Sequence, residues 1–238
     1  MSNLIWHDRR TFFKIAATAG VVLPLDWGFL RQIRARTAER NSLATPNLKI
    51  LSRSTIFVHP SGDPYDLSNR YGFNHAPSVV VLPDGRLLAA WFSGPYEASV
   101  HQVILGSFSS DHGQTWTKAE VLQDFPRVSD FDPAFIADGN RTWFFYLAGR
   151  WNRYPFVRDE ANQVGNNSFK TYCRYSDDSG RTWSAPAVVH NSATCRSNGI
   201  RLSTGELLLP ITDIPCCMTV GVLKSSDGGK SWKRFGRI

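Results

Sequence analysis

The chain has 238 residues, of which 13% are aromatic, with eight tryptophans, 18 glycines, 13 prolines and a formal net charge of +7. This composition is typical of a turn-rich β protein, and the length allows one large domain or two smaller ones. Residues 1–40 hold seven Lys and Arg against three Asp and Glu, so the other 198 residues carry only +3, which excludes the basic stripe of a nucleic-acid-binding protein.

The N-terminal segment is expected to be an export signal. The stretch DRRTFFKIAATAGVVLPL contains Arg9-Arg10 and resembles a twin-arginine signal, with Asp8 in place of the usual Ser or Thr. Its apolar run, Ile15–Leu25, is shorter than the roughly 20 residues that span a bilayer. We therefore expect residues 1–45 to be a signal and linker. The protein is then expected to be periplasmic or extracellular, and to contact a membrane only through this signal. The alternative is an amphipathic helix or a membrane anchor.

Strand signals recur in three rounds after residue 45, each with two strands joined by a tight turn, a longer loop, and two further strands. The first strands of the rounds begin 56 and 65 residues apart. An earlier strand at Lys49–His59 is expected to complete the last sheet of a closed ring. The strands expected in the three rounds are Ser78–Leu82, Leu87–Phe92, Val103–Ser109 and Ala119–Leu122; Ala134–Ala137, Thr142–Leu147, Lys170–Ser176 and Ala187–His190; Gly199–Leu202, Glu206–Thr212, Thr219–Ser225 and the residues before Ile238.

One phrase, S-x-D-x-G-x-[T/S]-W, follows the third strand of each round. Its Ser hydroxyl and Asp carboxylate are expected to bond to nearby backbone N–H groups, as such side chains do in turns. The glycine supplies a positive φ, and the tryptophan buries its ring against the sheet. The copies are SSDHGQTW at Ser109–Trp116, SDDSGRTW at Ser176–Trp183 and SSDGGKSW at Ser225–Trp232, with the turn glycines Gly113, Gly180 and Gly229.

This phrase resembles the Asp box, or BNR repeat, of sialidases and their β-propeller relatives. The resemblance implies an all-β fold, a sialidase-like six-bladed type of propeller, with about three four-stranded blades in residues 46–238. Sialidase-like propellers have six blades, and closure removes exposed strand edges. We therefore expect the chain to be the front half of a longer protein, or the product of a broken reading frame.

The strand order predicts where a site would lie. Strands within a blade alternate in direction, so the starts of the first strands and the loops between second and third strands share one face, while the Asp boxes lie on the other. First strands are innermost, so His75, Asp132 and Asn198 are expected to converge. The loops Ser93–Gln102, Gly149–Phe169 and Asp213–Met218 lie on the same face. Glu206 lies beside a turn on the opposite face and is discarded as a site residue.

The sialidase resemblance implies arginines that grip a sugar carboxylate, an acid, and a Tyr–Glu nucleophile pair, which would lie beyond residue 238. The phrase N-H-A-P at 74–77 places His75 where the family has Arg, and W-F-S-G-P-Y-E at 91–97 matches a sialidase-like subgroup, with His101 where that subgroup often has Asp. Arg196 is the expected carboxylate ligand, because its guanidinium forms two parallel hydrogen bonds. The residues predicted as catalytic are Glu97, His101 and Asp132, and those predicted to bind substrate are His75, Arg150, Arg153, Arg196 and Asn198.

Other interpretations of these residues remain open. His75 could cap its strand, Glu97 could form a solvated ion pair, and Asp132, before Pro133, could be a turn residue. The four cysteines are Cys173, Cys195, Cys216 and Cys217, and their spacing is not that of metal ligands. We expect them to be buried free thiols, and we expect neither a metal nor a cofactor.

The function predicted from the sequence is that of an exported sialidase-like glycoside hydrolase that acts on a carbohydrate or glycoconjugate with a terminal sugar, acidic or neutral, and lacks its C-terminal half. The alternatives are a non-catalytic carbohydrate-binding propeller and an inactive fragment.

Overall fold

The structure is a computed structural model that describes residues 50, 53–60, 69–150, 168–195, 197–213 and 219–236. The chain divides into two units, residues 1–51 and 52–238, and the second unit contains all the features below. The twin-arginine stretch lies outside the described residues, and the boundary at residue 45 stays a prediction. No helix in the described part of the chain is long and apolar enough to cross a membrane.

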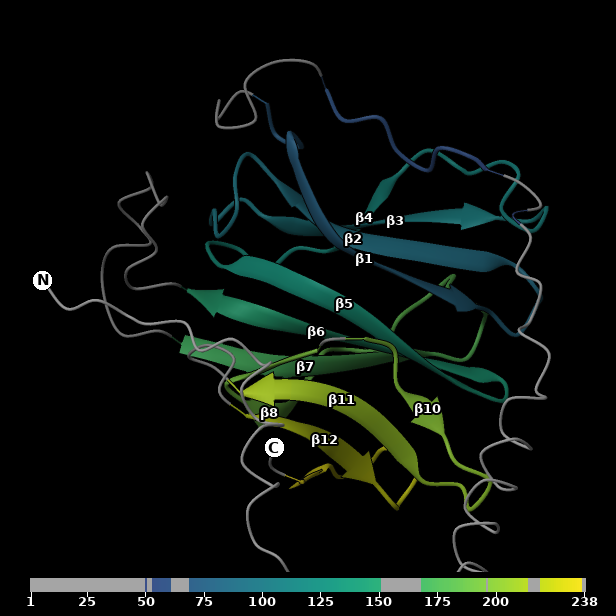
Figure 1. The fold of residues 1–238 in the computed structure, drawn as a ribbon, viewed down its shortest axis with the longest axis vertical. Coiled ribbons are helices and arrows are strands. Elements are labelled where there is room, and N and C mark those ends of the chain that lie inside the picture. Colours follow the sequence, from purple (N-terminus) through teal and green to yellow (C-terminus); the bar gives the residue numbers. More distant parts are fainter. Residues whose placement is uncertain are drawn as a thin grey trace, which may run out of the picture. The chain divides into compact units, whose positions relative to one another are not determined.

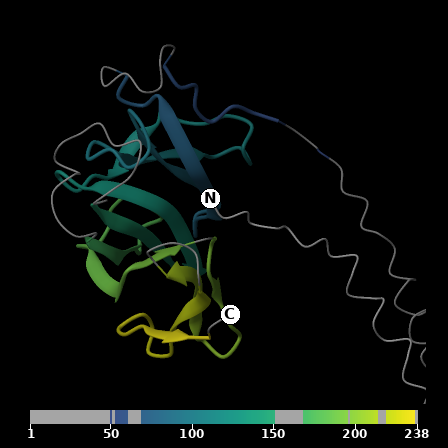
Figure 2. The same ribbon diagram turned by 60° about the vertical axis from the view of Figure 1, so that its left-hand side comes forward.

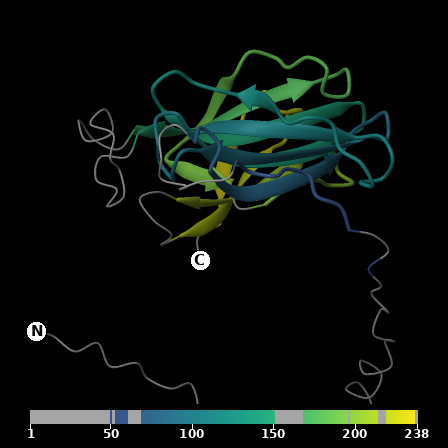
Figure 3. The ribbon, with the colours of Figure 1, turned by 90° about the horizontal axis from the view of Figure 1, so that it is seen from above.

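Three antiparallel sheets follow one another in chain order, with sheet 2 between sheets 1 and 3 (Figure 1). Figure 2 shows the same succession, whereas the sheets overlap in Figure 3, which is seen from above. Sheet 1 contains β1 (Phe73–Val81), β2 (Leu87–Gly94), β3 (Val103–Ser109) and β4 (Glu120–Gln123); sheet 2 contains β5 (Ser129–Asp138), β6 (Arg141–Arg150), β7 (Ser168–Ser176) and β8 (Ala187–Asn191); sheet 3 contains β9 (Ala193–Cys195), β10 (Ile200–Arg201), β11 (Leu207–Asp213), β12 (Val220–Ser225) and β13 (Lys233–Phe235).

The predicted three antiparallel sheets and the all-β fold are confirmed: within the described ranges the chain forms strands and turns and no helix. Sheets 1 and 2 have the predicted four strands, whereas sheet 3 has five, because β9 and β10 both pair with β11. β3 has the predicted bounds, and β4 is displaced by one residue from its prediction. The prediction of a strand at Lys49–His59 is wrong for its described part, because residues 53–60 form no strand. Ile56 and Phe57 instead pack against sheet 1, where the Phe57 ring lies 5.4 Å from that of Trp91.

The innermost strands of sheets 1 and 2 begin about five residues earlier than predicted. Each contains a bulge, and the prediction covers only the part of the strand that follows it. In β1, His75 pairs with Phe92 and the next pair is Ser78 with Ala90. β5 has the same irregularity between Phe131 and Ala134. Ala76 and Asp132, each followed by a proline, take the left-handed φ values of 49° and 48°. In sheet 3 the corresponding break separates β9 from β10, both of which pair with β11. Each inner strand is therefore interrupted at the same level.

Two hydrophobic cores join the sheets. One core lies between sheets 1 and 2 and includes Leu88, Ile104 and Phe144. The other lies between sheets 2 and 3 and includes Ile136 and Leu209. Sheet 2 thus packs against a neighbouring sheet on both faces. Exposed large apolar side chains occur in all three sheets, for example Val79 in β1, Val188 in β8 and Phe235 in β13. The predicted buried free thiols are confirmed for Cys173 and Cys195, while Cys216 and Cys217 lie outside the described residues.

The three S-x-D-x-G-x-[T/S]-W turns share one hydrogen-bond pattern. In the second turn, the Gly180 N–H donates to Ser176 Oγ over 2.8 Å, and Asp178 accepts from the Thr182 N–H and hydroxyl over 2.8 and 2.6 Å. The same bonds recur in the turns that begin at Ser109 and Ser225. The hydrogen bonds to the turn aspartates lower the pKa of Asp111, Asp178 and Asp227 to about 2. The turn glycines have the predicted positive φ, with values of 84° for Gly113, 79° for Gly180 and 82° for Gly229.

Each turn also contacts the element that precedes its own sheet. Gly180 packs on the Phe108 ring of sheet 1, and Gly229 packs on the Trp143 ring of sheet 2. The first turn contacts the segment before β1: Ser54 Oγ donates to the Gly113 carbonyl and accepts from Trp116 Nε1. The turns therefore hold successive sheets together as well as closing their own hairpins.

Candidate functional site

A pocket of about 300 Å³ lies where the three inner strands are interrupted. It is lined by Ala76–Val79 of β1, Asp132 and Pro133 of β5, and Cys195, Ser197 and Asn198 of the segment that links β9 to β10. Of the three residues that the strand order leads us to expect together, Asp132 and Asn198 line this pocket and His75 does not. We call this the central pocket.

Asn198 connects all three sheets at this point. Its Oδ1 accepts from the Ser78 hydroxyl over 2.5 Å and from the Phe135 N–H over 2.8 Å, and its Nδ2 donates to the Val79 carbonyl over 2.7 Å. Both lone pairs of the amide oxygen and one of its two N–H donors are therefore used within the protein. Its predicted part in substrate binding stays a prediction, and its structural part is evident from these bonds.

Asp132 is half-buried in the bulge of β5 and accepts a hydrogen bond on Oδ2 from the hydroxyl of Thr194, a residue of β9. Thr194 is itself only 3% exposed. The left-handed φ of Asp132 and the rigid ring of Pro133 fix the direction in which the carboxylate leaves the strand. The turn-residue interpretation and the functional one are therefore compatible: the bulge presents the carboxylate to the central pocket.

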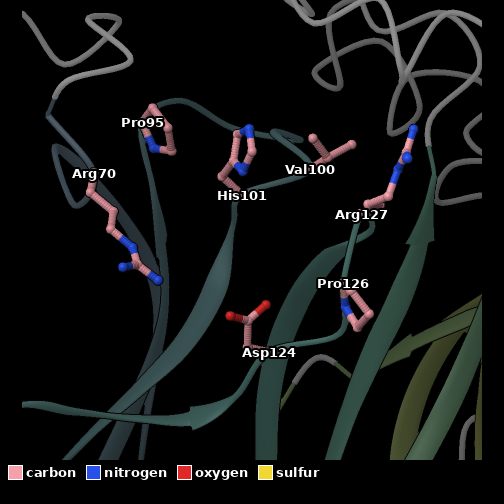
Figure 4. A pocket seen from close by; sticks show the side chains of 7 residues that line it. All are labelled: Arg70, Pro95, Val100, His101, Asp124, Pro126 and Arg127. Carbon is pink, nitrogen blue, oxygen red and sulfur yellow. The ribbon is translucent and has the colours of Figure 1, made fainter.

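The loop between β2 and β3 carries Glu97 and His101. Its other side chains are almost fully buried, whereas Glu97 is half-buried and His101 is exposed. His101 lines a second pocket of about 430 Å³, which Figure 4 shows from close by. In this view Arg70 and Asp124 point into the space beneath His101, and the side chain of Arg127 points away from it. The remaining residues that line this pocket are Pro95, Val100 and Pro126.

His75 lies in a third pocket, of about 260 Å³, with Phe57 and Trp91 among its lining residues. Its ring packs edge-on against Phe92, with the two ring centroids 5.5 Å apart. Pro77 lines both this pocket and the central one. The structure therefore places His75 next to the central pocket and not among its lining residues.

The predicted arginines are only partly described. Arg150, at the end of β6, donates from Nε to the Arg127 carbonyl over 2.8 Å, so it anchors the segment between β4 and β5. Arg153 and Arg196 lie outside the described residues, and their roles stay predictions. Glu206 is bound to Lys224 Nζ at 2.7 Å beside the turn of sheet 3, which agrees with its dismissal. No group of three His, Cys, Asp or Glu suited to a metal occurs among the residues that the structure describes.

Sequence reasoning missed a buried carboxyl group that contacts the segment between β4 and β5. Asp130 has no exposed surface, and its Oδ2 accepts from the Phe125 N–H over 2.9 Å. Burial raises the pKa of this carboxyl well above its usual range, and the charge of Asp124 acts in the same direction. The stretch S-D-F-D-P offers no pattern that would distinguish the buried Asp130 from the pocket residue Asp132.

A comparison with protein families matches residues 85–238 to the BNR repeat-like domain. This chain belongs to that family. Three curated relatives are sialidases: those of Bacteroides fragilis (25% identical over 183 residues, 66% of this chain and 34% of the relative), Paraclostridium sordellii (26% over 189 residues, 68% and 46%) and Micromonospora viridifaciens (26% over 207 residues, 74% and 32%). The chain therefore spans between a third and a half of the length of these members of the sialidase-like group.

Solved structures identify the fold. The microbial sialidase Hz136 matches 71% of this chain with 38% of its own length, at a TM-score of 0.56 and 20% identity. The Trypanosoma rangeli sialidase matches 69% of this chain with 31% of its own, at a TM-score of 0.53 and 18% identity. A Dyadobacter fermentans protein of unknown function matches 69% with 54%, at 0.55 and 19%. The three sheets are thus blades of a sialidase-like β-propeller, as the sequence predicted, and are called blades 1 to 3 below.

Proposed function

We propose that this chain is part of an exported sialidase-like glycoside hydrolase that acts on terminal sugars. The observation that carries the proposal is the central pocket, in which the Asp132 carboxylate lies where the inner strands of three blades are interrupted. The sialidase names of the curated relatives support sialic acid, an acidic sugar, as the terminal residue.

Hydrolysis of a glycoside needs a group that protonates the leaving oxygen. Asp132 and Glu97 are the candidates in this chain, with His101 as a third proton donor on the same loop as Glu97. Arg196 is the candidate that binds the sugar carboxylate, as the sialidase resemblance implies. The Tyr–Glu pair of that resemblance would have to come from residues beyond 238; sialidases are the group of glycosidases that uses a tyrosine nucleophile.

The test uses a form of the protein that includes the Tyr–Glu pair, and measures turnover of a fluorogenic 4-methylumbelliferyl sialoside and binding of sialic acid by calorimetry. Asp132→Asn should lower kcat by roughly 10²- to 10⁴-fold if the carboxyl transfers the proton. The matched control is Glu206→Gln, a carboxylate on the opposite face, which should change neither quantity. Binding without any turnover would support the alternative, a carbohydrate-binding propeller. If neither sialic acid nor a neutral sugar binds, the proposal is wrong.

The acidic-sugar part has its own test. A charge-assisted bidentate contact contributes about 1.5–3 kcal/mol, so Arg196→Ala should weaken sialic acid binding by roughly 10- to 150-fold. Arg196→Lys should restore little, because an ammonium cannot reproduce the planar fork. Equal affinity for sialic acid and its methyl ester, which lacks the carboxylate charge, would contradict an acidic substrate.

Export by the twin-arginine route is the remaining part of the proposal, and the pair Arg9-Arg10 supports it. Because a receptor reads the arginine pair, replacement of both by Lys should keep the protein in the cytoplasm although the charge is unchanged. Cell fractionation measures this, and an unchanged periplasmic yield would contradict the assignment.

A further inference from the structure

One buried amide joins the loop that carries Glu97 to the strand that carries Asp132. Gln102, the last residue of the β2–β3 loop, has no exposed surface. Its Oε1 accepts from the Ala98 N–H over 3.1 Å, and its Nε2 donates to the Asp130 carbonyl over 2.7 Å. Ala98 directly follows Glu97, and Asp130 lies two residues before Asp132. The side chain of Gln102 thus reaches from blade 1 into the inner strand of blade 2.

Further buried contacts close this junction. The Asp130 N–H donates to the Gln102 carbonyl over 3.1 Å, and the Ser129 hydroxyl donates to the Ser99 carbonyl over 2.7 Å. A Cβ on Gly94 would lie 3.1 Å from the Gln102 Cα, so the glycine lets the two backbones approach closely. Ser99, Ser129 and Asp130 are all without exposed surface, so water does not compete for these bonds.

The loop needs such a restraint because of its backbone. Ala98 has a φ of 67°, a left-handed conformation that disfavours side chains other than glycine by roughly 1–2 kcal/mol. The bond from the Ala98 N–H to Gln102 holds this conformation and thereby the direction in which Glu97 leaves the backbone. Glutamine meets the requirement because its amide offers an acceptor and a donor side by side; an ionised glutamate offers only acceptors, and methionine has no N–H donor.

We propose that Gln102 is a positioning residue that fixes the backbone at Glu97 relative to that at Asp132. The proposal rests on the proposed function in that it treats these two carboxylates as the candidate acids. Gln102 itself is buried and contacts no substrate; it acts through the two backbone segments that it joins.

The test compares Gln102→Met and Gln102→Glu with a matched control, Ser107→Ala. Ser107 lies in the same sheet, is equally buried, and donates to the Thr117 carbonyl over 2.7 Å, away from the loop. Hydrogen exchange of the Ala98 amide, measured by NMR in this chain, should become at least about tenfold faster in Gln102→Met, because the amide loses its acceptor. Ser107→Ala should leave it unchanged. Unchanged exchange in Gln102→Met would overturn the proposal.

The Gln102→Glu variant separates a hydrogen-bonding role from a space-filling one. Burial raises the pKa of the introduced carboxyl. Above that pKa the carboxylate still accepts from the Ala98 N–H but cannot donate to the Asp130 carbonyl. Exchange of the Asp130 amide, which bonds to the Gln102 carbonyl at this junction, should therefore be faster than in the unmodified chain, after correction for its intrinsic pH dependence. Below that pKa the protonated carboxyl donates again, and exchange should return toward the original rate. Gln102→Met should show no such recovery. If both variants behave alike at both pH values, the donor and acceptor of Gln102 are irrelevant.

The functional measurement is kinetic. In a form of the protein that includes the Tyr–Glu pair, Gln102→Met should lower kcat for the fluorogenic sialoside by at least about tenfold and leave KM within about twofold, because the geometry of proton transfer changes and the sugar-binding groups do not. A kcat within twofold of the original, with faster Ala98 exchange, would overturn the positioning role. Absence of turnover in an unmodified form that includes the Tyr–Glu pair would contradict the proposed hydrolase and not the restraint, which the exchange measurements decide by themselves.

Discussion

Gly229 in the third turn is the position at which a single methyl group should do most damage. A Cβ there would lie within 2.9 Å of three atoms of the Trp143 ring. The neighbouring Gly228 has a similar backbone, with φ of 69° against 82°, but a Cβ on it would meet nothing within 4 Å. Gly228→Ala is therefore a matched control for Gly229→Ala, because both variants place an L residue in the left-handed region.

The expected magnitudes follow from these surroundings. Each substitution costs about 1–2 kcal/mol for the left-handed backbone. Gly229→Ala adds overpacking, typically about 1–3 kcal/mol, because the Trp143 ring cannot easily withdraw. This ring is only 3% exposed, its Nε1 donates to Asp138 over 3.2 Å, and the Arg141 guanidinium lies 5.2 Å from its centre. Gly229→Ala should thus lower the free energy of unfolding by about 1–3 kcal/mol more than Gly228→Ala.

Urea denaturation followed by tryptophan fluorescence measures the difference. With a slope of about 2 kcal/mol per molar urea, the two midpoints should differ by about 0.5–1.5 M. Gly180→Ala should fall between them, because its Cβ would approach the Phe108 ring to 3.2 Å, a distance that a small ring shift relieves. Equal midpoints for Gly228→Ala and Gly229→Ala would refute the conclusion that the turn packs tightly on the preceding blade.

Two further predictions concern the turns and the central pocket. The pKa values of Asp111, Asp178 and Asp227 are lowered to about 2 in the folded chain, so their contribution to stability should be complete above about pH 4 and be lost as the pH falls toward 2. The urea midpoint should follow this course and do so less steeply in Asp178→Asn; an identical slope would contradict it. Asn198→Ala removes three hydrogen bonds of a half-buried side chain, and the matched control is Ser197→Ala, at an exposed position. The free energy of unfolding should fall by about 1–3 kcal/mol more in Asn198→Ala than in the control. No difference between the two variants would show that the amide does not join the blades.

Most of the fold could be predicted because its signals are local. The strand signals, the tight turns between first and second strands and the three repeated turns each lie within a short stretch of sequence, and they predict strands such as Val103–Ser109 correctly. The early starts of β1 and β5 could not be predicted, because they require non-glycine residues, Ala76 and Asp132, in a left-handed conformation that only the paired sheet makes tolerable. The prediction of a strand at Lys49–His59 fails for a different reason: its described part packs against Trp91 through the side chains of Ile56 and Phe57 and not through strand pairing.

The candidate site, like the fold, could be predicted only in part. Topology alone placed Asp132 and Asn198 at one pocket, because strand direction determines where strand starts meet. The bonds that decide what these groups can do join distant parts of the chain: Asn198 contacts Ser78, and Gln102 contacts Asp130. A sequence gives no sign of which buried amide will meet which carbonyl, so Gln102 and Asp130 were not recognised as important.

The contact of each turn with an earlier part of the chain has a consequence for biosynthesis. Gly180 rests on Phe108 and Gly229 rests on Trp143, so every blade finds its docking surface on residues that left the ribosome before it. The first turn follows the same rule, since Ser54 emerges ahead of Gly113. Domains generally fold from the N-terminal side during synthesis. Blade 1 can therefore serve as a template while blade 2 is being translated, and blade 2 can do the same for blade 3, which shortens the time for which the apolar face of a newly made sheet is open to aggregation.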